Sequence, residues 1–371
     1  MHIGLLAFQG SMNYGGVLQV YALQQTVKSM GHDCPIINYI PDMHDFKKHP
    51  LQYVLRRKNS LEKALFGLSN YDDFKTRQQL FSKFRSERLV LSPQQPVGYA
   101  NLAQEAFKYD VVCVGSDQLW NLNQPDSANR AYMLDFDRSN RSITYAVSFG
   151  DGIRQKPEET IAAIPLMKRF SSISVREQEG LDFLHAHGID AELALDSTLV
   201  ADKNVWGPFL GKAPIVEGKY ILVYGFANAN QSYGDLIDVS KRASHELGLP
   251  VICPVMTPTM GRAGFTNKFA CGPEEFLNLV EHASLVITSS FHGCVFSYLL
   301  NRPFAAVYGD GRPEPRKDTL LALLGEEERK LSPIQNPDYD RYLHCNFEYA
   351  DKRIASSRES SLRFLKNAIE G

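Results

Sequence analysis

Short apolar runs alternate with segments of helical periodicity along most of the chain, and this alternation constrains the fold more than any other feature. Buried strands are indicated by the length and apolarity of residues 3–8, 34–40, 111–115 and 142–147. Residues 17–30 have the spacing of an amphipathic helix, which Gly31 ends. A strand, helix, strand order requires parallel strands joined by a right-handed crossover. The sequence therefore predicts an α/β fold of parallel sheets with helices on their faces.

The alternation occurs twice, on either side of a segment rich in glycine and proline at residues 207–214. A chain of 371 residues is also too long for one ordinary hydrophobic core. Further strands are indicated at residues 171–175, 220–225, 250–253, 284–288 and 304–307. We therefore predict two doubly wound, Rossmann-like lobes, residues 1–210 and 215–345, followed by a C-terminal helix, residues 346–371, that crosses back to the first lobe.

Charge and cysteine usage limit the classes of protein to consider. The 40 Lys and Arg side chains nearly balance the 42 Asp and Glu side chains, so no nucleic-acid partner is expected. The six cysteines are scattered and form no C-x-x-C pair, which is typical of reduced thiols in the cytoplasm rather than of a zinc cluster. No apolar stretch approaches the length of a membrane span. We expect a cytoplasmic protein.

One segment, residues 44–90, interrupts the alternation and carries 11 Lys and Arg against 5 Asp and Glu. Its spacing indicates a helical insertion in the first lobe. Excess positive charge would help to recruit an anionic acceptor, such as a lipid-linked glycan, at the inner face of the cytoplasmic membrane. A solvated helical insertion explains the same charges. Peripheral membrane contact is therefore one of two interpretations.

Two polar side chains stand where a predicted strand ends and a helix begins. His292 follows the strand at residues 284–288, and Arg176 follows the strand at residues 171–175. In open α/β sheets, ligands bind at this edge, near helix N-termini. We interpret His292 as a catalytic or anion-binding group and Arg176 as a clamp for a phosphate or carboxylate. The alternatives are a packed or capping histidine and an ordinary ion pair of Arg176 with a neighbouring glutamate.

Five stretches of the chain carry a family resemblance. They are residues 13–19, 114–121, 145–150, 174–176 and 290–293. In these stretches the chain, from about residue 3 to residue 325, resembles the polysaccharide pyruvyl transferase family. The resemblance implies an enzyme that moves the pyruvyl group of phosphoenolpyruvate onto a sugar of a surface or capsular glycan precursor, forms a ketal and releases phosphate. It also implies a GT-B-like fold, with two Rossmann-like lobes facing a cleft.

The resemblance places Arg176 and His292 in the phosphoenolpyruvate site, with His292 as acid or base. Many relatives carry an arginine two residues before this histidine, where the present chain has Ser290. The missing cation must then come from elsewhere, unless the donor is held differently. The loop that begins at residue 308 offers three cations, Arg312, Arg316 and Lys317. Solvated surface charges explain these three residues equally well.

We expect the acceptor sugar to lie against the first lobe. Asp117 is placed to accept a proton from an attacking hydroxyl, and Trp120 to offer a flat face to a pyranose ring. The other acceptor-side candidates are Ser116, Gln118 and, in the glycine turn, Asn13, Tyr14 and Gly15. The structural alternatives are an Asx-type turn with Trp120 as core filler, and a plain glycine turn into a helix.

We expect no cofactor and no metal. The glycine turn at residues 10–16 fits neither the dinucleotide fingerprint nor the P-loop, and His185 and His187 have no carboxylate at ligand spacing. Two other functions remain open. One is a nucleotide-sugar-dependent glycosyltransferase of GT-B type, in which His292 contacts a diphosphate. The other is a non-catalytic, glycan-binding relative.

Overall fold

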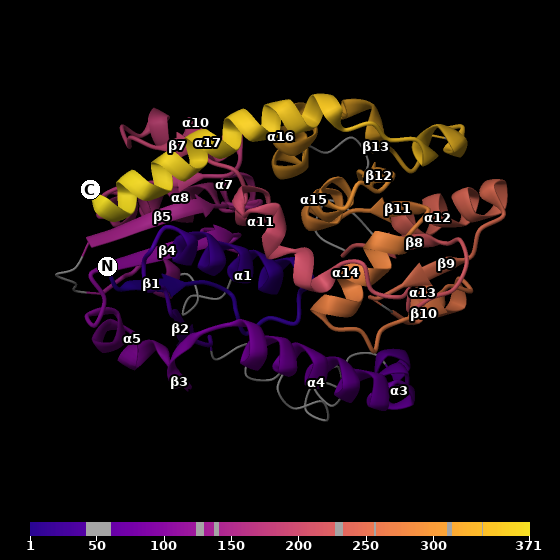
Figure 1. The fold of residues 1–371 in the computed structure, drawn as a ribbon, viewed down its shortest axis with the longest axis horizontal. Helices are drawn as coiled ribbons and strands as arrows, with labels where there is room; N and C mark the ends of the chain where they lie inside the picture. The colour runs from indigo at the N-terminus through magenta and orange to yellow at the C-terminus, as the bar shows by residue number, and fades with distance from the viewer. Residues whose placement is uncertain are drawn as a thin grey trace. The chain divides into compact units, whose positions relative to one another are not determined.

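The computed structural model describes residues 1–41, 61–123, 130–136, 141–226, 233–255, 257–309, 314–335 and 337–371. The chain forms two compact units. The first comprises Met1–Lys48, Arg85–Val205 and Ile354–Gly371, and the second comprises His49–Phe84 and Trp206–Arg353. Each unit is built on its own parallel sheet (Figure 1). The α/β class and the two Rossmann-like lobes are thus confirmed, and the cleft between them stays a prediction.

The first unit contains a seven-stranded parallel sheet in the order β3-β2-β1-β4-β5-β6-β7. Its strands are β1 Ile3–Leu6, β2 Ile36–Tyr39, β3 Leu91–Val97, β4 Val111–Asp117, β5 Arg141–Val147, β6 Ser174–Val175 and β7 Glu192–Leu193. The strand order reverses between β1 and β4. In doubly wound sheets this is the point where a ligand crevice opens at the carboxyl ends of the strands.

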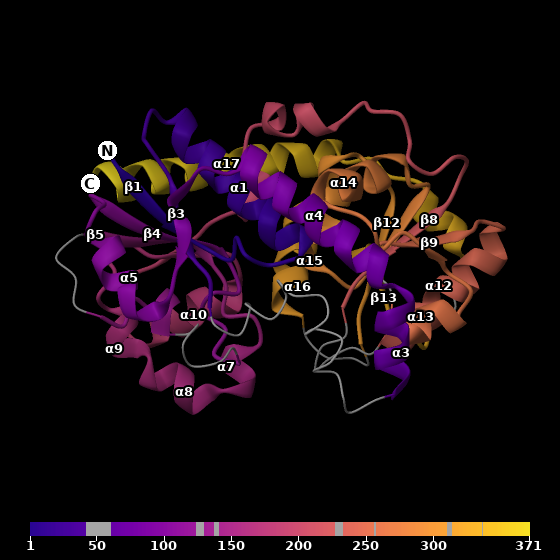
Figure 2. The same cartoon turned by 90° about the horizontal axis from the view of Figure 1, so that it is seen from below.

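Helices cover both faces of this sheet. Figure 2 shows α1 and α17 on one face and α7, α8, α9 and α10 on the other. The helices of the unit are α1 Tyr14–Ser29, α5 Tyr99–Ala106, α7 Gly152–Gln155, α8 Pro157–Ala162, α9 Ile164–Met167, α10 Gln178–Ala186 and α11 Ser197–Val200, with a 3₁₀ turn at Lys203–Val205. Because both faces are covered, the central strands β1 and β4 are largely apolar, and all of their residues except Asp117 are buried.

Helix α1 is held tightly against the sheet next to the reversal point. The side chain of Asn13 accepts a hydrogen bond from the backbone N–H of Gly16 at 3.1 Å and so caps the helix. A Cβ atom at Gly115 in β4 would lie 2.5 Å from Leu23 Cδ2 and 2.8 Å from Leu5 Cδ1. Glycine at this position therefore lets α1 approach the strands that carry the candidate site.

The second unit repeats the same plan with six parallel strands in the order β10-β9-β8-β11-β12-β13. They are β8 Ile221–Tyr224, β9 Val251–Cys253, β10 Thr266–Asn267, β11 Leu285–Thr288, β12 Phe304–Val307 and β13 Lys330–Leu331. Its helices are α3 Leu61–Ser69, α12 Tyr233–Leu247, α13 Pro258–Arg262, α14 Pro273–His282, α15 Phe291–Leu299 and α16 Pro315–Leu324, with 3₁₀ turns at Gly207–Phe209, Glu327–Arg329 and Tyr339–Leu343. The strand order reverses here between β8 and β11.

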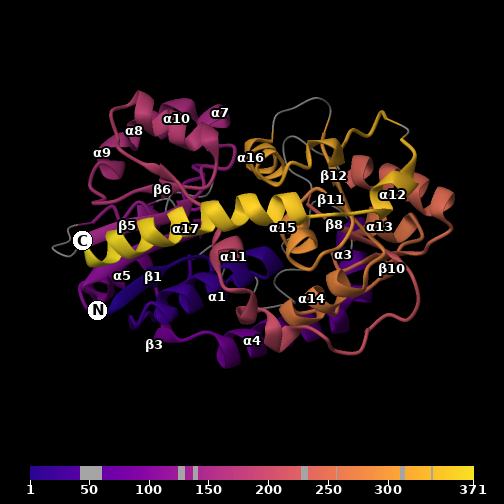
Figure 3. The same cartoon turned by 45° about the horizontal axis from the view of Figure 1, so that its top comes forward.

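Two helices contribute residues to both units. Helix α4, Tyr71–Arg88, belongs to the second unit up to Phe84, and helix α17, Glu348–Glu370, belongs to the first unit from Ile354 onward. Figure 3 shows α17 as a single helix that ends at the C-terminus. Within the first unit, Ser361 Oγ accepts from the backbone N–H of Leu195, and Arg358 donates to the carbonyl of Val200. The predicted return of the C-terminal helix to the first lobe is therefore confirmed.

The basic insertion differs from its prediction. Residues 44–60 lie outside the described residues, and residues 61–84 belong to the second unit rather than to the first. Arg77 is 5% exposed, donates to the carbonyls of Pro254 and Cys271, and lies over the ring of Phe269. Arg77, one of the charges predicted to lie at the surface, therefore helps to pack α4 against the rest of the second unit.

Candidate functional site

Several sequence-predicted residues of the first unit meet at the carboxyl edge of its sheet, beside the reversal point. Asp117 is the last residue of β4, and its side chain is 16% exposed. Its φ is +82°, in the left-handed region that L-residues other than glycine rarely adopt. The backbone carbonyl of Asp117 accepts from Leu119 N and from Ser148 N, both at 2.8 Å. These two bonds fix the turn that directs the Asp117 carboxylate.

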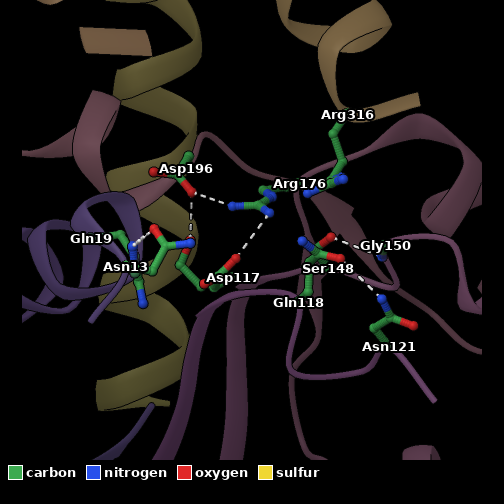
Figure 4. Close-up of polar contacts among 12 residues, drawn as sticks. Asn13, Gln19, Asp117, Gln118, Asn121, Ser148, Gly150, Arg176, Asp196 and Arg316 are labelled. Atoms are coloured by element: carbon green, nitrogen blue, oxygen red, sulfur yellow. Dashed lines mark hydrogen bonds and ion pairs between the residues drawn. The ribbon is translucent and has the colours of Figure 1, made fainter. Parts of the chain in front are cut away.

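Arg176 holds this carboxylate within a buried cluster of charges (Figure 4). Its Nη1 lies 2.7 Å from Asp196 Oδ2, its Nη2 lies 3.4 Å from Asp117 Oδ1, and its Nε lies 3.8 Å from Glu177 Oε2. The side chain of Arg176 is 1% exposed. Burial lowers the pKa of Arg176, but the Asp196, Asp117 and Glu177 carboxylates outweigh it and raise the pKa above its ordinary value. The guanidinium is therefore charged at every pH of an ordinary assay.

Asp196 is the residue of this cluster that the sequence analysis missed. It is 2% exposed and caps α11 by accepting from Thr198 N at 3.0 Å. Its Oδ2 accepts from Ser116 Oγ at 2.8 Å as well as from Arg176. The signal was an aspartate followed by Ser and Thr after an apolar stretch, which is a common capping pattern. The pattern alone does not distinguish an aspartate that only caps a helix from one that also pairs with an arginine.

The structure changes the interpretation of two predicted residues. Trp120 is 0% exposed, donates from Nε1 to the carbonyl of Tyr132, and packs edge-on against Phe149 and Phe170. The prediction that it offers a face to a pyranose ring is therefore wrong, and Trp120 fills the core. Ser116 is also 0% exposed. Its hydroxyl donates a hydrogen bond to Asp196 and does not reach the surface.

The glycine turn begins helix α1 close to Asp117. Asn13 is the N-cap of α1, and Tyr14 and Gly15 are buried in the first turn of that helix. An ideal Cβ at Gly16 would lie 3.5 Å from Asp117 Oδ2, so the start of α1 is close to the Asp117 carboxylate. Roles for these residues in acceptor binding stay predictions.

In the second unit, the predicted histidine lies at the equivalent reversal point. Ser290 is the N-cap of α15, and its Oγ accepts from the backbone N–H of Gly293 at 3.4 Å. His292 therefore lies in the first turn of α15, directly after β11. It is 6% exposed, and its ring is 5.2 Å from that of Phe291 at an angle of 85°. His292 and Arg176 are thus both buried.

The cations expected to replace an arginine at position 290 differ in their burial and contacts. Lys317 is 1% exposed, donates from Nζ to the carbonyl of Val307 at 2.7 Å, and lies 4.1 Å from the centre of the Tyr308 ring. Burial lowers the pKa of Lys317, an effect that Glu314 opposes. The side chain of Arg316 is 14% exposed and lies 3.9 Å from Glu314 Oε2. Arg312 lies outside the described residues.

The part of the chain that the structure describes contains neither a metal-binding cluster nor a membrane-spanning helix. Among the described residues, no group of three or more His, Cys, Asp and Glu side chains is arranged to hold a metal ion. Within the same residues, no helix is both long enough and apolar enough to cross a membrane.

Comparison with solved structures shows the fold. The chain is similar to UDP-GlcNAc 2-epimerase from Methanocaldococcus jannaschii, with 13% identity, 100% of each chain covered and a TM-score of 0.52. It is similar to UDP-GlcNAc 2-epimerase from Neisseria meningitidis, with 11% identity, 98% of this chain and 99% of that chain covered, and a TM-score of 0.54. It is also similar to the spinosyn rhamnosyltransferase SpnG, with 11% identity, 100% of each chain covered and a TM-score of 0.50.

Comparison with protein families is more specific. No curated protein matches the chain. The family model for polysaccharide pyruvyl transferase matches residues 13–311, and this range includes Asp117, Arg176, Asp196 and His292. The match covers most of the chain, from the N-cap of α1 to the loop after β12. The protein therefore belongs to the polysaccharide pyruvyl transferase family.

Proposed function

We propose that this protein transfers the pyruvyl group of phosphoenolpyruvate to two hydroxyls of a sugar in a surface glycan precursor, forming a ketal and releasing phosphate. The observation that carries the proposal is the family match over residues 13–311. It is supported by the position of one titratable side chain at the reversal point of each sheet, Asp117 in the first unit and His292 in the second.

The reaction needs proton transfer at both partners. A proton is added to the methylene carbon of phosphoenolpyruvate, and one sugar hydroxyl attacks C2 and loses its proton. Phosphate then leaves, the second hydroxyl attacks the same carbon, and the proton that this hydroxyl loses is carried away on the phosphate. One phosphoenolpyruvate and one diol therefore give one ketal and one phosphate. We assign His292 as the group that delivers the proton to the donor and Asp117 as the group that accepts a proton from the attacking hydroxyl.

The charges of the first unit favour a neutral acceptor over an anionic donor. The Arg176 guanidinium is surrounded by the carboxylates of Asp117, Glu177 and Asp196. With all four groups ionised, the cluster carries a net charge of −2 (one positive and three negative charges). Such a cluster repels a phosphate, so the predicted role of Arg176 as a donor clamp lacks support. We propose instead that Arg176 orients Asp117 and that the acceptor binds to the first unit.

The donor is assigned to the second unit. The first turn of α15 presents backbone N–H groups beside His292, and the N-termini of helices favour anions in this way. Arg316 is the partly exposed cation among the described residues of the predicted loop. We propose that Arg316 contacts the donor phosphate or carboxylate in place of the arginine that is absent at Ser290.

Substitution of the two loop cations tests this assignment. Arg316→Gln should weaken binding of phosphoenolpyruvate by about 1.5–3 kcal/mol, or roughly 10–150-fold in KM. Lys317→Met is the matched control, because the Lys317 ammonium is already bound to the Val307 carbonyl in the core. It should leave the donor KM unchanged. Equal effects of the two substitutions would mean that Lys317 leaves its carbonyl to bind the donor.

A thermal-shift experiment separates the proposed function from its alternative. Phosphoenolpyruvate at millimolar concentration should raise the melting temperature, because a ligand that binds only the native state stabilises it. Pyruvate plus phosphate serves as the control for non-specific anion effects. Stabilisation by UDP-sugars and not by phosphoenolpyruvate would instead favour a nucleotide-sugar-dependent glycosyltransferase. Stabilisation by neither would favour a non-catalytic relative.

We also propose that the protein acts in the cytoplasm on a sugar or lipid-linked glycan. All six cysteines are unpaired thiols, and Cys345 is the one that is not buried. Burial raises the pKa of Cys113, Cys253 and Cys294 to about 12, so these thiols are unreactive at neutral pH. Unpaired, buried thiols are typical of proteins in a reducing compartment.

A further inference from the structure

Near Asp117, the backbone N–H of Asn123 and the side chains of Asn121 and Gln118 form a series of hydrogen bonds whose direction is fixed. The backbone N–H of Asn123 donates to Asn121 Oδ1 at 3.1 Å. A backbone N–H can only donate, so the atom that receives this bond must be the amide oxygen of Asn121. The amide nitrogen of Asn121 then donates to Gln118 Oε1 at 3.0 Å. The orientation of both amides follows from one obligatory donor.

Gly150 allows the two amides to meet. It follows β5 with a φ of +56°, and its N–H donates to Ser148 Oγ at 3.0 Å. An ideal Cβ at this position would lie 2.4 Å from Gln118 Oε1 and 2.6 Å from Asn121 Nδ2. Any larger residue would therefore displace the pair. The close-up in Figure 4 shows Gln118, Asn121, Ser148 and Gly150 together at the sheet edge.

The locked pair leaves two donors available on Gln118. Its Oε1 is occupied by Asn121, so both N–H groups of Nε2 point away from this bond. Among the described residues, none accepts a hydrogen bond from Gln118 Nε2. Asn121 is 7% exposed, whereas Gln118 is partly exposed. The series of hydrogen bonds from Asn123 through Asn121 to Gln118 thus ends in two N–H donors that a ligand can reach.

The ligand that fits these donors is a neutral hydroxyl or ether oxygen. Gln118 follows Asp117 directly in the chain, and the cluster around Asp117 carries more carboxylates than guanidinium groups. Anions are repelled here, while a polyol can donate to the Asp117 carboxylate and accept from the Gln118 amide. The set of one acceptor and two donors suits adjacent oxygens of a sugar.

We propose that Asn121 is a positioning residue that locks Gln118 as a donor to an oxygen of the acceptor sugar, beside the hydroxyl that Asp117 binds. The proposal rests on the proposed function, because it names the acceptor subsite of that reaction. Gln118 contacts the sugar, and Asn121 acts through Gln118. Gly150 is the residue that makes their contact possible.

Equilibrium binding of neutral sugars tests the proposal without requiring turnover. The probes are a panel of methyl glycosides of common hexoses and N-acetylhexosamines, measured by ligand-observed NMR against the full-length protein. The glycoside that binds the wild type best is then measured with each variant. Loss of two neutral hydrogen bonds should weaken its binding by roughly 10–30-fold.

The variants distinguish the residue that contacts the sugar, Gln118, from the residue that positions it, Asn121. Gln118→Glu keeps the oxygen that Asn121 binds and replaces the donors with an acceptor, so it should weaken glycoside binding. Asn121→Asp removes the N–H that fixes Gln118 Oε1, so the Gln118 amide should turn inward and binding should weaken to a similar extent. In a Gln118→Ala background, Asn121→Asp should have no further effect on binding. If Asn121 had only a structural role, Asn121→Asp would weaken glycoside binding further in the Gln118→Ala background.

Asn123→Asp is the matched control. The side chain of Asn123 is exposed and donates to Gln155 Oε1, while its backbone N–H keeps the bond to Asn121. Glycoside binding should be unchanged in this variant. Unchanged binding in Asn121→Asp, an additional loss in the Gln118→Ala background, or failure of the wild type to bind any glycoside would each overturn the inference.

Binding of phosphoenolpyruvate distinguishes the loss of the sugar subsite from the absence of pyruvyl transfer. Binding of phosphoenolpyruvate, followed in the same samples by thermal shift, should be the same in the wild type and in all of these variants. If the wild type binds a glycoside but not phosphoenolpyruvate, the pyruvyl transfer fails while the sugar subsite stands. If it binds phosphoenolpyruvate and the Gln118 and Asn121 variants still bind the glycoside, the subsite fails alone.

Discussion

Arg176→Ala should lower the free energy of unfolding by about 3–5 kcal/mol, the range for removing one partner of a buried ion pair. The side chain is 1% exposed and neutralises part of the charge of Asp117, Glu177 and Asp196. Without it, three carboxylates are left close together, two of them at 1% or less exposure. Denaturant unfolding at pH 7 measures the effect. A loss below about 1 kcal/mol, the value typical of surface pairs, would contradict the cluster described here.

The same variant should depend on pH in a defined direction. In the wild type the pKa of Arg176 is raised, so its contribution to stability is present below the ordinary pKa of arginine and is constant between pH 5 and pH 8. In Arg176→Ala, the folded state can relieve the repulsion by protonating one carboxylate. The stability difference between wild type and variant should therefore be larger at pH 8 than at pH 5. A difference that grows as the pH falls would contradict this account.

Arg154→Ala is the matched control for Arg176→Ala. Arg154 also lies near two carboxylates, 3.4 Å from Asp151 and 3.7 Å from Glu179, but its side chain is 29% exposed. Screening by water should limit its loss to about 0–1 kcal/mol. Comparison of the two variants isolates the effect of burial from the effect of ion pairing.

His292→Asn should lower kcat by about 10²–10⁴-fold, the usual contribution of a positioned acid or base. Asparagine keeps a polar side chain in the first turn of α15 but cannot transfer a proton. The fold should be retained, because Ser290 still caps the helix. The measurement is ketal formation under saturating phosphoenolpyruvate, with a parallel unfolding curve.

His282→Asn provides the control for His292→Asn. His282 is the last residue of α14, is partly exposed, and contacts the carbonyl of Asn278 through Nδ1. Activity should be unchanged in this variant. If His292→Asn keeps most of the wild-type kcat, the proton is delivered by another group and the assignment of His292 is wrong.

Much of the fold was predictable because parallel strands buried on both faces are short apolar runs. The runs near β1, β4, β5, β8, β11 and β12 all form strands. The strand β3 was missed. It contains Pro93 and Pro96 and lies at the edge of the sheet, where missing N–H donors are tolerated. The two-residue strands β7, β10 and β13 are too short to leave a periodic signal.

Helix starts were predicted less well because caps extend helices beyond their apolar pattern. Helix α1 begins at Tyr14, three residues before the predicted start, since Asn13 caps it. Helix α15 likewise begins at Phe291, so His292 lies inside the helix rather than just before it. The assignment of residues 61–84 to the second unit was not predictable, because it depends on contacts such as those of Arg77 with Pro254 and Cys271.

The candidate site was predictable in position but not in its partners. The strand-end rule identified Asp117, Arg176 and His292, and all three lie at the carboxyl edges of the sheets. Asp196 was missed because a capping aspartate and an ion-pairing aspartate have the same local sequence. Trp120 was misassigned because an indole suits a sugar face and a core equally well. Only the packing of distant segments distinguishes these cases.

In the proposed reaction, phosphoenolpyruvate supplies a pyruvyl group that forms a ketal on a sugar. The most direct test is to incubate the protein with phosphoenolpyruvate labelled with ¹³C at C2 and with the glycoside that it binds best, and to follow the reaction by ¹³C and ³¹P NMR. We predict a labelled ketal carbon in the glycoside and one phosphate released for each ketal formed. Consumption of a UDP-sugar with phosphoenolpyruvate left intact, or release of phosphate with free pyruvate and no ketal, would contradict the account.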